Sequence, residues 1–283
     1  MRQDTMPAIV APLHAPVVRP LRPLAFVDGQ GVNTPTLSKA VTAVITRVQA
    51  GRPFTVFTLN LDHLVKRRAD AAFRAAYARA DIVTADGQPV VALARRHGAQ
   101  LERTTGADLI MPLCAAAEAA GVPVYFFGAT DESLEAAAAR LKRWYPRLDV
   151  RGSEAPPMGF DPTGEAATAA GRRIAASGAR ICFVALGAPK QEMFADRLAG
   201  LHRDEGQAVG YVCIGAALDF ISGRQHRAPV LFQRMGLEWA YRLCTNPVRL
   251  GLRYARCAAL YAQLRLTSKS PPHGGGVPQP YPA

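Results

Sequence analysis

The sequence predicts an α/β protein with a mostly parallel sheet and helices on both faces. Short β-branched or aromatic runs alternate with longer alanine-rich stretches, and hydrophobic residues make up 49% of the 283 residues. Strands that alternate with helices in this way are typical of a Rossmann-like sheet. After residue 221 the pattern changes to helix without strands, which predicts a C-terminal helical appendage.

The expected elements follow the chain in order. Strands are predicted at 54–59, 82–85, 122–127, 148–151, 181–186 and 209–214. Helices are predicted at 61–80, 88–97, 107–120, 131–145, 163–177, 190–203 and 216–222. In the appendage, Pro229 can begin a helix that runs to Leu243, and Asn246-Pro247 interrupts it before a second helix at 248–266.

Four segments therefore make up the predicted domain organisation. A disordered tail at 1–23 precedes an α/β domain at 24–221. A basic amphipathic appendage follows at 222–267, and the Pro- and Gly-rich segment 268–283 forms a second disordered tail. In parallel sheets ligands bind beyond the carboxyl ends of the strands, so functional residues are expected there.

The positive charge is concentrated near the C-terminus. The chain has 34 Lys and Arg against 22 Asp and Glu, a net charge of +12. Residues 222–283 contain nine basic and one acidic residue, whereas 61–221 contain nineteen of each. Such an end needs a polyanionic partner, namely nucleic acid, an anionic membrane surface or a phosphorylated substrate.

The second appendage helix is expected to be amphipathic. Arg249, Arg253 and Arg256 share one face, and apolar residues follow another. The helix either packs on the body with its arginines in water, or its arginines meet anionic lipid or a pyrophosphate.

Cysteine usage and hydropathy indicate the compartment. The five cysteines are widely spaced, match no metal or disulfide pattern and lie in apolar or helical runs, so we expect buried thiols in a reducing compartment. No stretch approaches the roughly 18 apolar residues of a membrane span. We expect a cytosolic protein that contacts a membrane only at its surface.

Polar residues at two strand ends are candidates for chemistry. Thr58 and Asn60 lie where the first strand gives way to a helix, so their polar groups could face a ligand, but a strand Thr and a helix-capping Asn also explain them. Asp86-Gly87 closes the second strand. Asp86-Gly87 forms a plain turn in one interpretation. In the other, Asp86 is partly desolvated, its pKa is raised and it acts as a general base.

Two further segments suit an anionic ligand. In Arg103-Thr-Thr-Gly-Ala-Asp108, Thr105 either simply caps the next helix or leaves backbone N–H groups that bind phosphate beside Arg103. In Gly187-Ala-Pro-Lys-Gln-Glu192, a turn after an apolar strand places Lys190 and Gln191 at a helix N-terminus, a good seat for a diphosphate.

Seven motifs in order resemble the WecG/TagA/CpsF glycosyltransferase family, over about residues 50–256. They are Thr58-Leu-Asn60, Ala85-Asp-Gly87, Arg103-Thr-Thr-Gly-Ala-Asp-Leu109, Gly187-Ala-Pro-Lys-Gln-Glu192, Gly215-Ala-Ala-Leu-Asp219, Arg227-Ala-Pro229 and Gly236-Leu-Glu-Trp-Ala-Tyr-Arg-Leu243. The resemblance implies an inverting transferase that moves a sugar from a UDP-sugar to a polyprenyl-pyrophosphate-linked sugar. Its pathway would be exopolysaccharide or cell-envelope polysaccharide synthesis, on the inner face of the plasma membrane.

The resemblance also assigns roles to residues. It places the catalytic base at Asp86, with Thr58 near it and the acceptor. It implies that substrate or lipid pyrophosphate is bound by the following residues: Asn60, Arg103, Gly106, Gly187, Lys190, Gln191, Glu192 and Asp219 for the substrate, and Arg227, Arg242, Arg249 and Arg253 for the lipid pyrophosphate.

Partners and rival functions follow from the same motifs. The resemblance implies no cofactor, and the chain has no convincing Asp-x-Asp metal motif. A nucleotide- or dinucleotide-dependent oxidoreductase would explain the α/β body, but the G-x-G-x-x-G fingerprint is missing. A nucleic-acid-binding protein would explain the basic end, but no recognised binding motif is present, so we expect no nucleic-acid partner. UDP-glucose and UDP-N-acetylmannosamine both stay open as donors, and the sequence allows a homo-oligomer.

Overall fold

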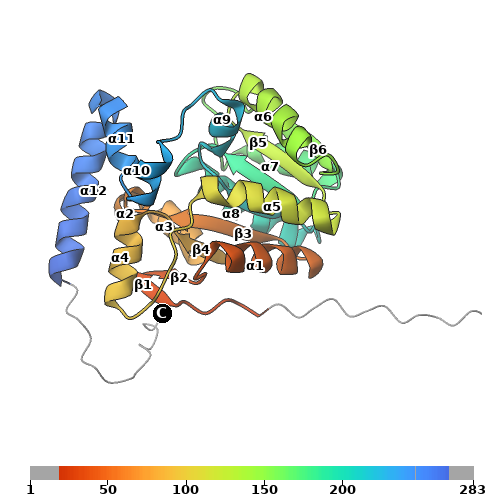
Figure 1. Ribbon diagram of the computed structural model, residues 1–283. Coiled ribbons are helices and arrows are strands. Elements are labelled where there is room, and N and C mark those ends of the chain that lie inside the picture. The colour runs from red at the N-terminus through yellow and green to blue at the C-terminus, as the bar shows by residue number, and fades with distance from the viewer. Residues whose placement is uncertain (1–18, 246, 268–283) are drawn as a thin grey trace, which may run out of the picture.

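The computed structural model describes residues 19–245 and 247–267, which form an α/β body with the C-terminal helices of the appendage beside it (Figure 1). The central sheet has six parallel strands in the order β4-β3-β8-β7-β5-β6. The strands are β3 Phe54–Leu59, β4 Ile82–Ala85, β5 Val124–Gly128, β6 Val150–Glu154, β7 Ile181–Ala185 and β8 Gly210–Cys213. The predicted Rossmann-like α/β class is confirmed.

Strand positions agree with the sequence patterns to within a few residues, but two strands begin two residues later than predicted. The strand expected at 122–127 begins at Val124, because Pro123 has no N–H for the ladder and its carbonyl instead accepts from the Arg180 N–H at 2.9 Å. The strand expected at 148–151 begins at Val150, since Leu148 closes a turn onto the Tyr145 carbonyl.

Helices cover both faces of the sheet and bury a separate apolar core on each. Side chains alternate along β3, so that Phe54 and Val56 join one core while Phe57 and Leu59 join the other. The first core is covered by α1 Leu37–Gln49, α5 Gly106–Ala120, α6 Asp131–Trp144 and α9 Ala217–Ser222. The second is covered by α2 Leu61–Ala69, α3 Ala71–Ala78, α4 Gln88–Arg96, α7 Glu165–Ala176 and α8 Lys190–Asp204.

Three elements depart from the prediction. The helix expected at 61–80 is broken at Asp70, which ends α2 and caps α3 by accepting from the Phe73 N–H at 3.0 Å. An antiparallel hairpin of β1 Ala25–Val27 and β2 Gln30–Val32 was not predicted, nor was α1. The segment after the hairpin covers the outer edge of β4, where the Asn33 backbone and side chain bond Val83.

The appendage contains one more break than expected. The helix predicted from Pro229 to Leu243 is divided into α10 Val230–Arg234 and α11 Glu238–Thr245, with Gly236 between them at a φ of +72°. The last helix, α12 Pro247–Thr267, packs against α2 and α4 and lies along that side of the body in Figure 1. Its residues Cys257, Leu260 and Leu264 are buried, so α12 packs on the body, whichever partner its arginines meet.

Surface features correct one prediction. Cys114, Cys182, Cys213 and Cys257 are buried, but Cys244 on α11 is exposed, because this short helix stands outside both cores. Over 19–245 and 247–267, no helix has the length and hydropathy to cross a membrane. The predicted tails fall outside the described residues, except for residues 19–23.

Candidate active site

Asp86 and Thr58 come together at the carboxyl ends of two neighbouring strands. In the parallel pair β3 and β4, Thr58 is opposite Thr84 and Leu59 is opposite Ala85, so Asp86 follows directly. The Asp86 N–H donates to the Leu59 carbonyl at 2.8 Å, and the Thr58 hydroxyl donates to Asp86 Oδ2 at 3.3 Å. The next residue, Gly87, has a φ of +102°, which allows the chain to turn sharply into α4.

Asn60 fixes the carboxylate from a second direction. Its Oδ1 accepts from the His63 N–H at 3.0 Å and caps α2, so its Nδ2 is the atom left to donate in the hydrogen bond to Asp86. Burial raises the pKa of Asp86 to about 6, against the lowering effect of the Asn60 bond and of Arg103. Asp86 is still partly exposed, so it can be reached by a ligand and can exchange a proton near neutral pH.

The N-terminus of α5 lies beside these strand ends. Thr105 and Asp108 form a reciprocal capping box, so Thr105 does cap the helix. Gly106 is pressed against Ile214, the residue that follows β8, since a Cβ there would be 2.7 Å from Ile214 Cα. Arg103 lies 3.2 Å from Asp108, at the same helix terminus.

A second arginine reaches Asp108 from the appendage. Arg227 approaches Asp108 at 2.6 Å and Glu238 of α11 at 3.7 Å. Burial alone would raise the pKa of Asp108, but the bond from Arg227 and the charge of Arg103 hold it below its ordinary value. Two guanidinium groups and a helix N-terminus therefore meet within the site, an arrangement suited to phosphate.

The segment Gly187–Glu192 follows β7 and so lies at the same carboxyl end of the sheet. Lys190 is exposed and its Nζ donates to the Phe160 carbonyl at 3.0 Å. Gln191 is buried, and its Oε1 accepts from the Gly215 N–H at 3.0 Å, which ties the start of α8 to the end of β8. Its Nε2 donates to Glu192 Oε1 at 2.7 Å.

Glu192 belongs to a buried polar cluster rather than to the open surface. It is fully buried, and burial raises its pKa to about 7. Its Oε1 is 4.0 Å from His63 Nδ1, which in turn is 2.6 Å from the Tyr77 hydroxyl. Burial lowers the pKa of His63 to about 3, so the ring is neutral. The Tyr77 hydroxyl also lies 3.3 Å from the Thr58 carbonyl, which connects the cluster to the strand that carries Thr58.

Asp219 and Arg253, two other predicted residues, contact side chains other than Asp86. Asp219 accepts from Ser133 at 2.8 Å and from the Gln225 side chain at 3.1 Å, so it joins α6, α9 and the start of the appendage. Arg253 lies 3.0 Å from Asp62 on α2. The side chains of Arg242 and Arg249 lie outside the described residues.

Several residues of this site were missed by the sequence reasoning. They are Asp108, Asp62, His63, Lys66 and Tyr77. Asp108 had a usable signal, since it occupies the third position of the capping box that begins with Thr105. Tyr77 had none, because a tyrosine within an alanine-rich helix is most simply a core residue.

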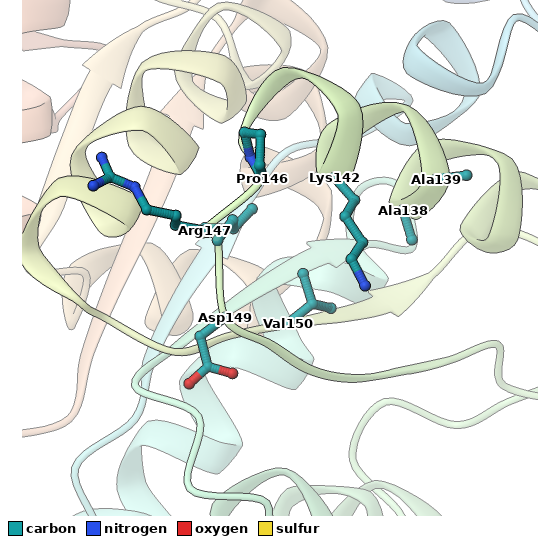
Figure 2. A pocket seen from close by; sticks show the side chains of 8 residues that line it. Ala138, Ala139, Lys142, Pro146, Arg147, Asp149 and Val150 are labelled. Atoms are coloured by element: carbon teal, nitrogen blue, oxygen red, sulfur yellow. The ribbon is translucent and has the colours of Figure 1, made fainter.

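Two surface hollows are lined by residues other than Asp86, Thr58 and Arg103. One of about 450 Å³ lies between α2 and α12 and is lined by Val65, Arg68, Ala69, Arg256, Ala259, Leu260 and Gln263. Another of about 420 Å³ is lined by Ala138, Ala139, Lys142 and residues 146–150 (Figure 2). Because residues 146–149 precede β6, it opens at the amino end of the strand on the edge opposite β4. We assign the chemistry to the strand ends instead, where titratable groups converge. No group of three metal-ligating side chains occurs within the part of the chain that the structure describes.

The fold and the site together define an α/β enzyme with a carboxylate of raised pKa beside an anion-binding helix terminus. The model of the glycosyl transferase WecG/TagA/CpsF family matches residues 26–272, so the chain belongs to this family. The protein is therefore a glycosyltransferase of cell-envelope polysaccharide synthesis, a class that uses a nucleotide-sugar donor and a lipid-linked acceptor.

Proposed function

We propose that the protein is an inverting glycosyltransferase that moves a hexose or N-acetylhexosamine from a UDP-sugar to a polyprenyl-pyrophosphate-linked sugar. The observation that carries the proposal is the Asp86 carboxylate. It is partly exposed, it has a pKa of about 6, and Thr58 and Asn60 hold it beside a cationic helix terminus. A base of this pKa is mostly ionised at pH 7 and still accepts a proton readily.

The proposed reaction is a single displacement at the anomeric carbon. Asp86 takes the proton of the acceptor hydroxyl while the acceptor oxygen forms a bond to that carbon. On the opposite face the bond to the UDP oxygen breaks, and UDP leaves with the electron pair. One displacement of this kind inverts the configuration.

Charge that grows on the departing diphosphate must be stabilised by the protein. The N-termini of α5 and α8, with Arg103, Lys190 and Arg227, are the groups proposed for this role. Gly187 would let the backbone come near the phosphates, and Gly106, pressed against Ile214, would hold the N-terminus of α5 beside them. Asn60 would orient the base. The buried Gln191 and Glu192 and the partly exposed Asp219 would fix the surrounding segments rather than touch the sugar.

Acceptor binding is assigned to the appendage. The arginines proposed to meet the lipid pyrophosphate are Arg227, Arg242, Arg249 and Arg253. Large apolar side chains are exposed on α10, α11 and the first turns of α12, namely Val230, Leu231, Phe232, Met235, Trp239, Val248 and Leu252. Apolar side chains among basic residues favour attachment to an anionic bilayer, which supports a peripheral position on the cytoplasmic face of the plasma membrane.

A donor screen tests the reaction. UDP-glucose and UDP-N-acetylmannosamine are each incubated with a polyprenyl-pyrophosphate monosaccharide, and the product is identified by mass and anomeric configuration. Transfer with inversion from one donor, lost in Asp86→Asn, is expected. A product of retained configuration, or transfer from neither UDP-sugar when another nucleotide sugar serves, would overturn the proposal.

Vesicle binding tests the membrane contact with the full-length chain. Truncation before α12 is unsuitable, because Leu260 and Leu264 of α12 are part of the core. Val248→Ser with Leu252→Ser should lower sedimentation with anionic vesicles, since each buried aliphatic side chain contributes about 1.5 kcal/mol or more. Leu266→Ser, an equally exposed site at the far end of α12, is the matched control. Unchanged sedimentation of the double variant would contradict this contact.

A further inference from the structure

A charged contact joins α12 to the body where α2 begins. Arg253 Nε lies 3.0 Å from Asp62 Oδ1, and Asp62 is buried although it is ionisable. Asp62 lies two residues after Asn60, the cap of α2 that also holds Asp86. A shift of α12 would therefore change the contacts of the first turn of α2.

The contact continues from Asp62 to the turn before α8. One helical turn further along α2, Lys66 Nζ lies 2.7 Å from Asp62 Oδ2. The same ammonium donates to the Ala188 carbonyl at 2.9 Å, 122 residues away in sequence. Ala188 lies between Gly187 and Pro189, in the turn that leads to Lys190 and Gln191.

The three contacts depend on one another because one carboxylate serves two cations. With Arg253 in place, the charge of Asp62 is shared between a guanidinium and an ammonium. Without Arg253, the buried carboxylate has to rely more on Lys66, which weakens the donation from Lys66 to the neutral Ala188 carbonyl. Loss of that bond would loosen the turn.

We infer that Asp62 and Lys66 are positioning residues that couple the seating of α12 to the turn at Gly187–Pro189, so that the diphosphate of the donor is held firmly only when α12 is docked. This inference rests on the proposed function, because the turn is taken to face the nucleotide diphosphate. It gives Arg253 a second role, exerted through Asp62, in addition to its proposed contact with lipid pyrophosphate.

Hydrogen exchange on the full-length protein without ligand tests the coupling directly. Amides of residues 187, 188, 190 and 191 should exchange faster in Arg253→Gln and in Lys66→Met than in the unmodified protein. Arg256→Gln removes the same charge from an exposed position one turn along α12 and is the matched control. Unchanged exchange in Arg253→Gln, with α12 still protected, would refute the coupling.

Binding and kinetics provide a second readout, which a purely structural role would not move. Lys66→Met should raise the Kd for UDP at least about 5-fold, a typical size for coupling between sites, and should raise KM for the donor more than it lowers kcat. Arg253→Gln should raise the donor KM in the unmodified background but add little to it in Lys66→Met. Additive effects in the double variant would show that Arg253 does not act through Lys66.

The two proposals fail in different ways. If no UDP-sugar is used but exchange at the turn responds to Arg253→Gln, the coupling stands and the proposed donor is wrong. If sugar is transferred from a UDP-sugar while Arg253→Gln and Lys66→Met change neither the exchange at the turn nor the donor KM, the glycosyl transfer stands and the coupling is wrong.

Discussion

Asp86→Asn is the most informative substitution, because it should stop catalysis and stabilise the fold at the same time. The amide has nearly the shape of the carboxylate, and its oxygen can still accept from Thr58 and Asn60. It cannot accept a proton from the acceptor hydroxyl. General-base catalysis typically contributes about 10²- to 10⁴-fold, so kcat should fall within that range while UDP affinity stays nearly unchanged.

The gain in stability follows from the raised pKa of Asp86. The pKa rises from 3.8 to about 6 through burial, and one pKa unit corresponds to about 1.4 kcal/mol. Ionised Asp86 therefore destabilises the folded protein by about 3 kcal/mol at most, and by less where solvent screens the charge. The penalty is absent below about pH 4, grows between pH 4 and 6 and is complete above that. The gain should be largest at pH 7.5 and about half as large at pH 5.

Two assays check these expectations. Initial rates with saturating donor and acceptor give kcat, and urea denaturation at pH 7.5 and pH 5 gives the free energy of unfolding. Asp149→Asn, the same change at the amino end of β6, is the matched control and should keep full activity. Near-normal turnover of Asp86→Asn would reject Asp86 as the base, and a loss of stability at pH 7.5 would reject the burial argument.

Three other substitutions have defined outcomes. Thr58→Val removes a hydroxyl that donates to Asp86, so the acid limb of the kcat profile should move to higher pH; an unmoved limb in the pH–rate profile would contradict this. Gly106→Ala places a Cβ 2.7 Å from Ile214 Cα and should cost about 1–3 kcal/mol in urea denaturation, whereas unchanged stability would mean that α5 can move away. Arg227→Gln removes a cation from Asp108 and should weaken UDP binding about 10-fold by calorimetry, and unaltered affinity would place the diphosphate elsewhere.

The alternation of strands and helices could be read from the sequence, because buried parallel strands are short apolar runs that few other structures produce. The hairpin at Ala25–Val32 and helix α1 could not. The hairpin strands have three residues each, and the bonds to β4 come from Asn33, which follows the hairpin and is distant from β4 in sequence. A sequence pattern shows only the periodicity of neighbouring residues, whereas the hairpin and α1 depend on contacts between distant segments.

The candidate site was predictable where strand ends determine it. Thr58, Asn60 and Asp86 meet because neighbouring parallel strands end at the same edge. The environment of each side chain was not predictable. Glu192 lies two residues after the exposed Lys190, yet it is fully buried against His63, because the first turn of α8 directs these two side chains differently. Which side of a helix faces a ligand is decided by its packing.

The appendage arginines whose side chains the structure describes at the site are already held by carboxylates. Arg227 contacts Asp108 and Arg253 contacts Asp62, so an incoming anion has to replace or share an existing ion pair. A singly charged anion gains little binding energy by such an exchange, because it attracts the guanidinium no more strongly than the carboxylate that it replaces. A diphosphate offers more charge and several acceptor oxygens at once, and it also reaches the backbone N–H groups of α5. Holding the arginines on carboxylates therefore lowers absolute affinity but favours diphosphates over simple anions, which is the discrimination that a pyrophosphate-linked acceptor and a nucleoside diphosphate donor both require.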